Sequence, residues 1–304
     1  MVRNGSRIRA RLGRWTVATL AAGMVASLAA AAAPTTAAAA PGSYVALGDS
    51  YTSGPFIPLQ LQPYGCLRSD HNYAHLVASS LGLALDDVSC AGATTDDMTQ
   101  SQGVTPGPNP PQFDALNVST QVVTLGIGGN DIHFSSIAES CFSTTPTGQP
   151  CQDKYGNNGQ SPDVIDGYIQ ATAPKVAAAV QGIHARSPAA KVVVVGYPAI
   201  FPEQPLLPGA PEGCWPSLPV APADVPYLRA KEKELNAMLA TEAAANNAGF
   251  ADTYTPSIGH DACEPPVIRW VEPLVPASPA APIHPNLFGM EGMAAVVQQA
   301  IQSA

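Results

Sequence analysis

Short apolar runs that end in glycine and small polar residues alternate along this chain with segments of helical periodicity. The first run, residues 44–47, is Tyr-Val-Ala-Leu and stops at Gly48-Asp49-Ser50, which predicts a buried strand followed by a turn that carries Ser50. Similar runs predict four more strands, over residues 85–90, 121–127, 191–195 and 250–254. Apolar residues at helical spacing predict helices over residues 72–81, from 161 onward, over 225–248 and over 286–303.

The ends of the helices have their own signals. Asp224 is expected to cap the helix over 225–248, and Pro174 is expected to begin a new helical segment. The stretches 141–160, 198–222 and 255–285 are expected to be loops. Strands that alternate with helices favour an α/β fold with a mostly parallel sheet covered on both sides. No repeat or linker divides the chain, so we expect one domain over residues 41–304.

The first 40 residues resemble a secretory signal peptide. Five arginines precede an apolar, alanine-rich stretch, and small residues lead up to Pro41. A permanent membrane anchor is the alternative, although alanine is a weak membrane residue. We therefore expect a secreted, extracellular protein with no stable membrane insertion.

The net charge bears on possible partners. Without the first 40 residues, nine basic and 23 acidic residues give a net charge of −14, which argues against nucleic acid as a partner.

The cysteine content fits an exported protein. Six cysteines in an exported chain indicate three disulfides. We favour the pairing that ties off three successive loops, namely Cys66–Cys90, Cys141–Cys151 and Cys214–Cys263. Zinc is the alternative, but neither C-x-x-C nor H-E-x-x-H occurs.

Candidate chemistry lies where three predicted strands end. Ser50 follows the first strand, Gly92 the second and Asn130 the third, while His284 stands late in the chain. A serine hydroxyl becomes a nucleophile when an imidazole accepts its proton, and the resulting oxyanion needs preorganised donors. The backbone N–H groups of Ser50 and Gly92 and the side-chain amide of Asn130 can supply three. Each residue alone is also typical of an ordinary turn or helix cap.

Four ordered blocks resemble the GDSL or SGNH superfamily of serine esterases and lipases. They are Gly48-Asp49-Ser50-Tyr51-Thr52-Ser53-Gly54, Cys90-Ala91-Gly92-Ala93-Thr94-Thr95, Gly128-Gly129-Asn130-Asp131 and His284-Pro285. The resemblance covers nearly all of the chain after the signal and is strongest to secreted actinobacterial members with three disulfides. It implies a flavodoxin-like three-layer α/β/α fold, no metal and no cofactor. A Gly-x-Ser-x-Gly elbow is absent, as the resemblance implies.

One position departs from the family pattern. Members often carry an aspartate three residues before the histidine, where this chain has Ala281. We therefore expect a Ser50–His284 pair whose imidazole is oriented by a backbone carbonyl from Ala281 or Pro282. Asp261 and Glu264, upstream, are the alternative orienting groups.

The leading prediction is a monomeric carboxylic-ester hydrolase that acts on lipid or other small-molecule esters. Loop residues are expected to line an acyl pocket, namely Phe56, Ile57, Leu59, Leu61, Phe134, Leu206, Leu207 and Trp215. One alternative is an esterase that removes acetyl groups from extracellular polysaccharide. Another is an inactive cell-surface binding module, although a binding module has no use for a nucleophile, a base and oxyanion donors together.

Overall fold

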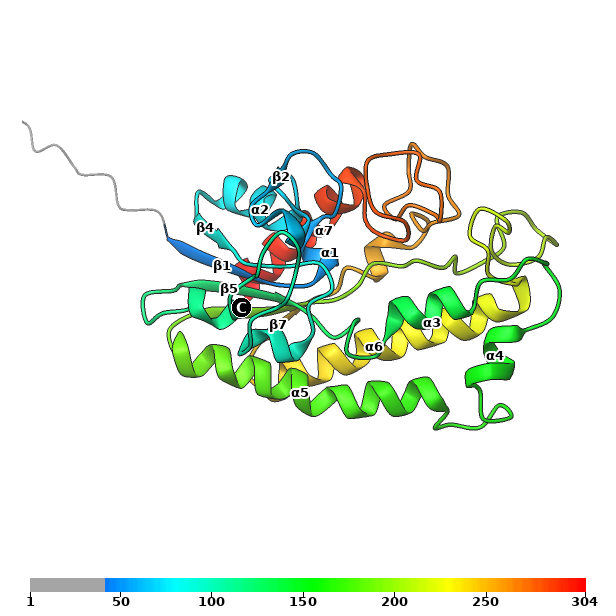
Figure 1. Ribbon diagram of the computed structural model, residues 1–304, viewed down its shortest axis with the longest axis horizontal. Helices are drawn as coiled ribbons and strands as arrows, with labels where there is room; N and C mark the ends of the chain where they lie inside the picture. Colours follow the sequence, from blue (N-terminus) through cyan, green and yellow to red (C-terminus); the bar gives the residue numbers. More distant parts are fainter. Residues whose placement is uncertain (1–41) are drawn as a thin grey trace, which may run out of the picture. The chain divides into compact units, whose positions relative to one another are not determined.

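A five-stranded parallel sheet forms the centre of the computed structural model, which describes residues 42–304 (Figure 1). Its strands are β1 (Ser43–Gly48), β4 (Ala84–Asp87), β5 (Val122–Gly126), β6 (Lys191–Val195) and β7 (Gly249–Ala251), in the order β4-β1-β5-β6-β7. The chain builds the sheet outward from β1 in both directions, so the order reverses between β1 and β5. In open α/β sheets, ligands bind beyond the carboxyl ends of the strands at such a reversal.

Two pairs of helices cover the sheet, one pair on each face (Figure 1). Helices α2 (Tyr73–Leu81) and α7 (Leu287–Ser303) pack together on one face, and α5 (Val164–Arg186) and α6 (Val225–Ala245) on the other. Buried residues form a separate apolar cluster under each pair. The predicted α/β fold with a helix-covered parallel sheet is therefore confirmed.

Local sequence signals set several of the helix ends. The side chain of Asn72 accepts a hydrogen bond from the His75 N–H at the start of α2, and Gly82 ends that helix in a left-handed conformation. Asn286 caps α7 in the same way, through the Gly289 N–H. These ends lie where the sequence predicts them.

Three helix predictions are wrong. Helix α5 runs unbroken through Pro174, because a long helix that packs against α6 tolerates the loss of one backbone hydrogen bond. Helix α4 (Pro150–Tyr155) forms inside the stretch 141–160 that was expected to be a loop, and α3 (Phe134–Ser140), which the sequence does not predict, precedes it. The side chain of Asp224 accepts from the N–H groups of Cys151 and Gln152, so it caps α4 rather than α6.

Short elements and three disulfides complete the fold. Strands β2 (Gln60–Leu61) and β3 (Arg68–Ser69) form a small hairpin, and α1 (Ser50–Ser53) is a single turn. The disulfides are Cys66–Cys90, Cys141–Cys151 and Cys214–Cys263, the pairs favoured from the sequence. The predicted signal peptide, residues 1–40, lies outside the described residues.

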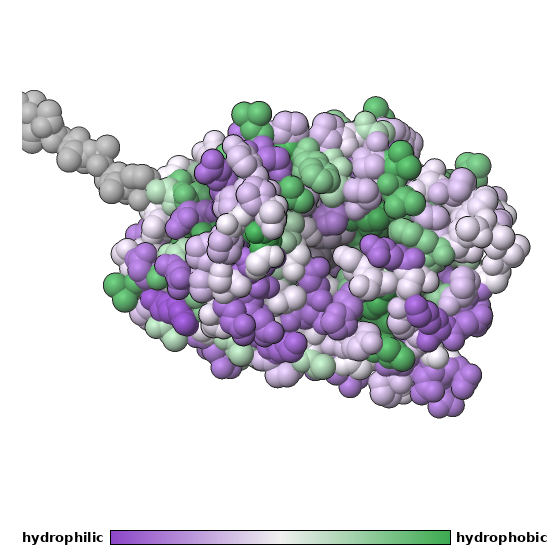
Figure 2. All heavy atoms as spheres, viewed as in Figure 1, coloured by the Kyte–Doolittle hydropathy of each residue, from purple (hydrophilic) through white to green (hydrophobic). Residues whose placement is uncertain are grey.

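The surface carries both polar and apolar side chains. Figure 2 shows apolar side chains in several separate patches among polar ones. No helix within residues 42–304 combines the length and apolar character needed to cross a bilayer.

Candidate active site

Ser50 lies on the first turn after β1, beside the end of β5. Asp49 caps this turn, because its Oδ1 accepts a hydrogen bond from the Tyr51 N–H at 2.9 Å. The ends of β1 and β5 approach closely here: a Cβ at Gly48 would lie 2.6 Å from the carbonyl oxygen of Gly126. A side chain at position 48 would therefore clash with the neighbouring strand end, directly before the turn that carries Ser50.

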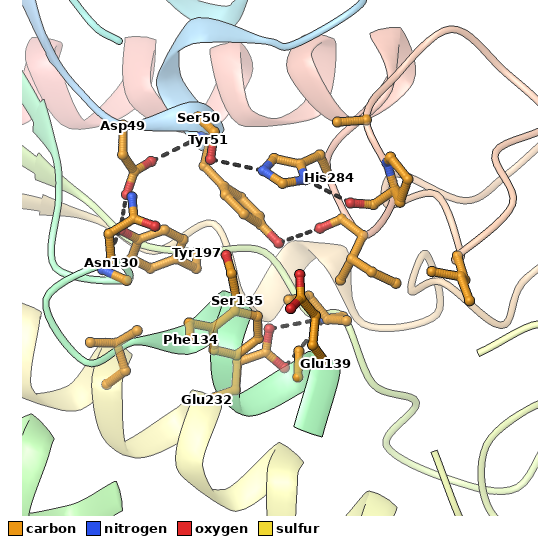
Figure 3. A pocket seen from close by; sticks show the side chains of 18 of the residues that line it. Asp49, Ser50, Tyr51, Asn130, Phe134, Ser135, Glu139, Tyr197, Glu232 and His284 are labelled. Atoms are coloured by element: carbon orange, nitrogen blue, oxygen red, sulfur yellow. Dashed lines mark hydrogen bonds between the residues drawn. The ribbon is translucent and has the colours of Figure 1, made fainter. Parts of the chain in front are cut away.

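The structure brings His284 to Ser50 from 234 residues further along the chain. His284 Nε2 lies 2.8 Å from Ser50 Oγ, and His284 Nδ1 lies 2.8 Å from the carbonyl oxygen of Pro282 (Figure 3). Since a carbonyl can only accept, Nδ1 carries the proton and Nε2 is free to accept one. Burial lowers the pKa of His284 below its ordinary value, and the hydrogen bond to Pro282 partly opposes this shift.

The two upstream carboxylates do not contact His284. Asp261 accepts a hydrogen bond from the Cys263 N–H at 2.9 Å, and burial raises its pKa to about 6. Neither Asp261 nor Glu264 makes a hydrogen bond to His284 in the described part of the chain. Pro282, one of the two residues expected to orient the histidine by its carbonyl, is thus the partner of Nδ1.

A buried ion pair supports the segment that carries His284. Glu272 is fully buried and accepts from Asn286 Nδ2 at 2.7 Å, and the guanidinium of Arg269 lies 2.9 Å from its other oxygen. The backbone of Glu272 also bonds to that of His284 and of Ile283. Residues 269–286 therefore form a compact unit that presents the imidazole at its edge.

Asn130 and Gly92 lie on neighbouring loops at the same end of the sheet. Asn130 Nδ2 donates to the carbonyl oxygen of Ala93 at 2.9 Å, which leaves its second hydrogen free. Gly92 has a φ of +80°, a conformation that favours glycine. Within residues 42–304, the backbone N–H groups of Ser50 and Gly92 have no acceptor. This end of the sheet therefore carries three N–H donors, from Ser50, Gly92 and Asn130, without an acceptor among residues 42–304.

A pocket of about 300 Å³ opens beside Ser50 and His284, with Asn130 at its edge (Figure 3). Most of its wall is apolar and comes from Tyr51, Phe134, Ala138, Phe142, Ile200, Leu235, Leu274, Ala281, Pro282 and Ile283. The histidine can therefore activate the Ser50 hydroxyl, and the apolar wall beside it can hold an apolar part of a substrate. Among the described residues, no group of three His, Cys, Asp or Glu side chains is placed to hold a metal ion.

The family comparison agrees with this geometry. The model of the GDSL-like lipase/acylhydrolase family matches residues 46–291. The chain belongs to this family. It is 40% identical to Lipase 2 of Streptomyces coelicolor over 260 residues, 83% of each chain, and 31% identical to a lipase of Streptomyces rimosus over 223 residues. It is therefore a hydrolase of the lipase/esterase type.

Solved structures of two Streptomyces enzymes share the fold. The extracellular lipase of S. rimosus superimposes with a TM-score of 0.68 at 27% identity, covering 85% of this chain and 99% of that one. A phospholipase A1 of S. albidoflavus gives a TM-score of 0.70 at 24% identity, with 86% and 100% coverage. At 24% identity, the likeness to the phospholipase supports a shared fold and says nothing about the substrate of this chain.

In this GDSL-like hydrolase, the expected acyl-pocket residues mostly lie elsewhere. Phe134 is the one that lines the pocket. Ile57 is buried in the apolar cluster under α2 and α7, while Leu206 and Leu207 are exposed. The prediction was wrong mainly because it chose the wrong loops: the apolar loop residues at the pocket are Phe142, Ile200, Leu274 and residues 281–283, and spacing along the chain does not show which loops meet at Ser50.

Three other residues of the GDSL-like site were not singled out from the sequence. Tyr51 and Tyr197 both line the pocket, with their rings edge to face at 5.1 Å. Glu232, on α6, lines it too and accepts from the Ile200 N–H at 3.0 Å, and burial raises the pKa of its carboxyl well above the ordinary value. The position of Tyr51 directly after the serine was the one available signal.

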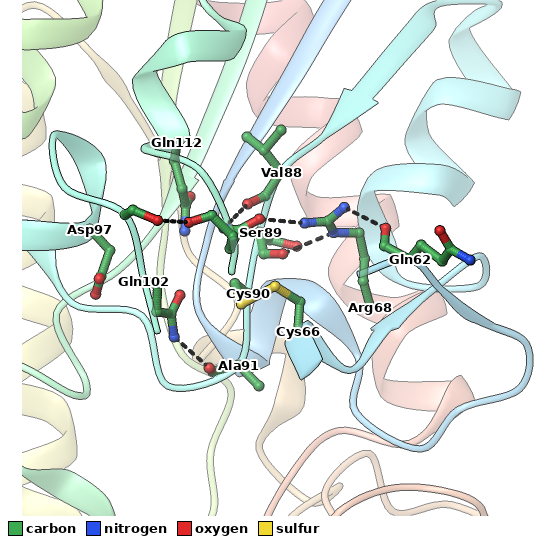
Figure 4. The surroundings of a disulfide bond; sticks show 12 residues. Gln62, Cys66, Arg68, Val88, Ser89, Cys90, Ala91, Asp97, Gln102 and Gln112 are labelled. Carbon is green, nitrogen blue, oxygen red and sulfur yellow. Dashed lines mark hydrogen bonds between the residues drawn. A yellow bond between two sulfur atoms is a disulfide. The ribbon is translucent and has the colours of Figure 1, made fainter. Parts of the chain in front are cut away.

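The disulfide Cys66–Cys90 fastens the turn that carries Gly92 (Figure 4). The same turn is held from its other side by Gln102, whose Nε2 donates to the carbonyl oxygen of Ala91 at 2.8 Å. Gly92 is therefore held in place by a covalent and a polar contact, although it does not line the pocket itself.

Proposed function

We propose that the protein is a secreted carboxylic-ester hydrolase that works through an acyl-enzyme on Ser50. The observation that carries the proposal is the 2.8 Å contact between Ser50 Oγ and His284 Nε2, on an imidazole whose other nitrogen is bonded to a carbonyl. This is the arrangement that a nucleophilic serine and its general base require.

In the proposed acylation step, Ser50 Oγ attacks the ester carbonyl carbon while His284 Nε2 accepts the hydroxyl proton. The carbonyl electron pair moves onto its oxygen, which gives a tetrahedral oxyanion. The carbon–oxygen bond to the alcohol then breaks, and the alcohol leaves with the proton from Nε2. Water repeats the sequence on the acyl-enzyme: His284 takes its proton, the acid is released and Ser50 regains its hydrogen.

The oxyanion is proposed to bind the N–H groups of Ser50 and Gly92 and the Asn130 side chain. All three are neutral donors, and Asn130 is already oriented by its bond to Ala93. Preorganised donors of this kind stabilise the oxyanion without reorganisation, and losing one typically costs about 10²–10³ in rate.

The substrate is proposed to be a lipid or other fatty-acyl ester, because the pocket wall beside Ser50 is mostly apolar. Relatives named lipases agree with this class. Secretion is supported by the signal-like segment over residues 1–40 and by the three disulfides.

A p-nitrophenyl ester series from acetyl to palmitoyl tests the proposal. We expect activity to rise from acetyl toward medium or long chains, and Ser50→Ala and His284→Ala to lower kcat by about 10⁴-fold or more. Ser79→Ala, an exposed serine on α2, is the matched control and keeps wild-type rates. A preference for acetyl would favour the polysaccharide esterase, and a folded, oxidised protein without turnover on any ester would favour the binding module.

A further inference from the structure

The hydroxyl of Tyr197 joins two of the loops that form the site. It donates to Asp49 Oδ2 at 2.5 Å, on the turn that carries Ser50, and it accepts from the Gly129 N–H at 2.8 Å, on the loop that carries Asn130. Figure 3 shows Asp49, Tyr197 and Asn130 grouped on the side of Ser50 that faces away from His284. One buried oxygen atom therefore connects the turn of the nucleophile to the loop of the oxyanion donor.

Tyr197 itself is rigidly held. Its backbone N–H donates to Asn236 Oδ1 at 2.8 Å, and its carbonyl oxygen accepts from Asn236 Nδ2 at 3.1 Å, so α6 fixes both sides of the residue. The side chain is 6% exposed and packs edge to face on Tyr51. The hydroxyl has little freedom to adopt another position, because the backbone of Tyr197 is bonded to α6 and its ring is packed against Tyr51.

The loop of Asn130 is shaped to accept this hydroxyl. A Cβ at Gly129 would lie 3.0 Å from the Tyr197 oxygen, so only glycine allows the 2.8 Å bond without displacement. The Gly129 carbonyl oxygen accepts from the Phe134 N–H, which leaves both ends of the residue bonded. Tyr197 therefore holds the peptide between Gly128 and Gly129, and the Phe134 N–H holds the next peptide, which leads into Asn130.

We propose that Tyr197 is a positioning residue that sets the oxyanion donor Asn130 against the nucleophile Ser50. The inference rests on the proposed function of these two residues. Tyr197 does not touch the reacting atoms; it acts through Gly129 on one side and Asp49 on the other. Since displacement by about 1 Å of a group that stabilises a transition state can cost about 10²-fold in rate, the loss of this bridge affects the chemical step.

Tyr197→Phe removes the hydroxyl and keeps the ring against Tyr51. We expect kcat to fall by about 10- to 100-fold with KM changed by less than about 2-fold, because only the transition state uses the oxyanion donors. The Ki of an alkyl trifluoromethyl ketone, which forms a tetrahedral adduct with a serine, should rise by the same factor as kcat falls. Tyr227→Phe is the matched control, since it removes a tyrosine hydroxyl that donates to Asp163, and it should leave kcat, KM and Ki unchanged.

Asp49→Asn weakens the same bridge from its other end, and it tests the proposal if Tyr197→Phe does not fold. The amide oxygen can still accept from the Tyr51 N–H, but the amide nitrogen can only donate, so the short bond from the Tyr197 hydroxyl to a charged oxygen is replaced by a weaker bond in the opposite direction. A parallel fall in kcat and rise in Ki is again expected. A raised KM with an unchanged Ki, or wild-type kcat in both variants, would overturn the positioning role.

The two proposals fail in distinguishable ways. If Ser50→Ala keeps activity, the proposed function itself fails, whatever Tyr197→Phe does. If Ser50→Ala is inactive while Tyr197→Phe retains wild-type kcat and Ki, the acyl-enzyme stands and the inference about Tyr197 is wrong.

Discussion

The Tyr51 hydroxyl donates a 2.7 Å hydrogen bond to the carbonyl oxygen of Ile283, so the residue after Ser50 holds the residue before His284. Ile283 has a φ of +59°, which is unfavourable for a β-branched side chain and costs on the order of 1–3 kcal/mol. Contacts on both sides maintain that conformation: Tyr51 binds the carbonyl, and the Ile283 N–H donates to Glu272. The serine and the histidine are therefore tied together by more than their own hydrogen bond.

Tyr51→Phe tests the role of the hydrogen bond between Tyr51 and Ile283. We expect kcat to fall by about 10-fold because the histidine segment is no longer fixed to the turn of Ser50. Amide hydrogen exchange at residues 281–286 should become faster at the same time. Tyr64→Phe, on an exposed tyrosine, is the control. Unchanged exchange and unchanged kcat in Tyr51→Phe would show that His284 is held without Tyr51.

A carboxylate is not expected to orient His284. Asp261→Asn and Glu264→Gln should each keep kcat within about 2-fold of wild type, because the Pro282 carbonyl already fixes the tautomer. Steady-state kinetics on a p-nitrophenyl ester is the measurement. Loss of turnover by about 10⁴-fold in either folded variant, the cost of a wrong tautomer in a triad, would contradict the Ser50–His284 pair.

The pH profile should report two groups. His284 acts as a base only when neutral, and burial lowers its pKa, so the main acid limb of kcat/KM should lie below pH 6.5. Asp49 faces Tyr197, the Tyr51 N–H and the more distant Asp131, and burial raises its pKa to about 7. As the pH falls through that value, Asp49 takes up a proton and the Tyr197 hydroxyl loses its charged acceptor, which weakens the bridge. A shallow first step near pH 7 should therefore precede the main limb.

Measuring kcat/KM from pH 4 to 9, with released p-nitrophenol quantified by chromatography, separates these steps. Tyr197→Phe should remove the shallow step and leave the limb of His284 in place. A single limb centred above pH 7 in both proteins would contradict the lowered pKa of His284.

Glu272 should matter for stability. Burial alone would raise the pKa of this carboxyl, but hydrogen bonds from Asn286 and Ala277 and the charge of Arg269 hold it below the ordinary value. Glu272→Gln leaves the buried Arg269 without its charge partner, so we expect a loss of about 3 kcal/mol in the free energy of unfolding at pH 7.

The stabilisation from Glu272 should depend on pH. Because its pKa is lower in the folded state, the contribution is complete above the ordinary value of 4.5 and is lost as the pH falls through the folded value. Urea unfolding at pH 7 and at pH 4 should therefore show a smaller difference between wild type and Glu272→Gln in acid. An equal difference at both pH values would contradict the charged pair.

The sequence predicted those parts of the fold whose signals are local. The apolar run before Gly48-Asp49-Ser50 became β1, and Asn72 and Asn286 cap the helices that follow them. Helix α4 could not be predicted, because its N–H groups are satisfied by Asp224, over 70 residues away. The unbroken course of α5 through Pro174 likewise depends on packing against α6.

In the site, too, residues with local sequence signals were predicted and residues that act through long-range contacts were not. Ser50, Asn130 and His284 stand in recognisable blocks, and the structure brings all three to one end of the sheet. Tyr197 lies in no such block. Its proposed role depends on hydrogen bonds to Asp49 and Gly129, which follow two other strands of the sheet. Contacts of this kind arise from the topology of the sheet, which residue spacing alone does not specify.

The most direct test of the account is to identify the acylated residue. The protein is mixed with a long-chain p-nitrophenyl ester and quenched in acid within the first turnover, and its peptides are analysed by mass spectrometry. We predict one acyl group per chain, located on Ser50 and absent from Ser50→Ala. An acyl group on another residue, or turnover by Ser50→Ala at the wild-type rate, would contradict the proposed acyl-enzyme.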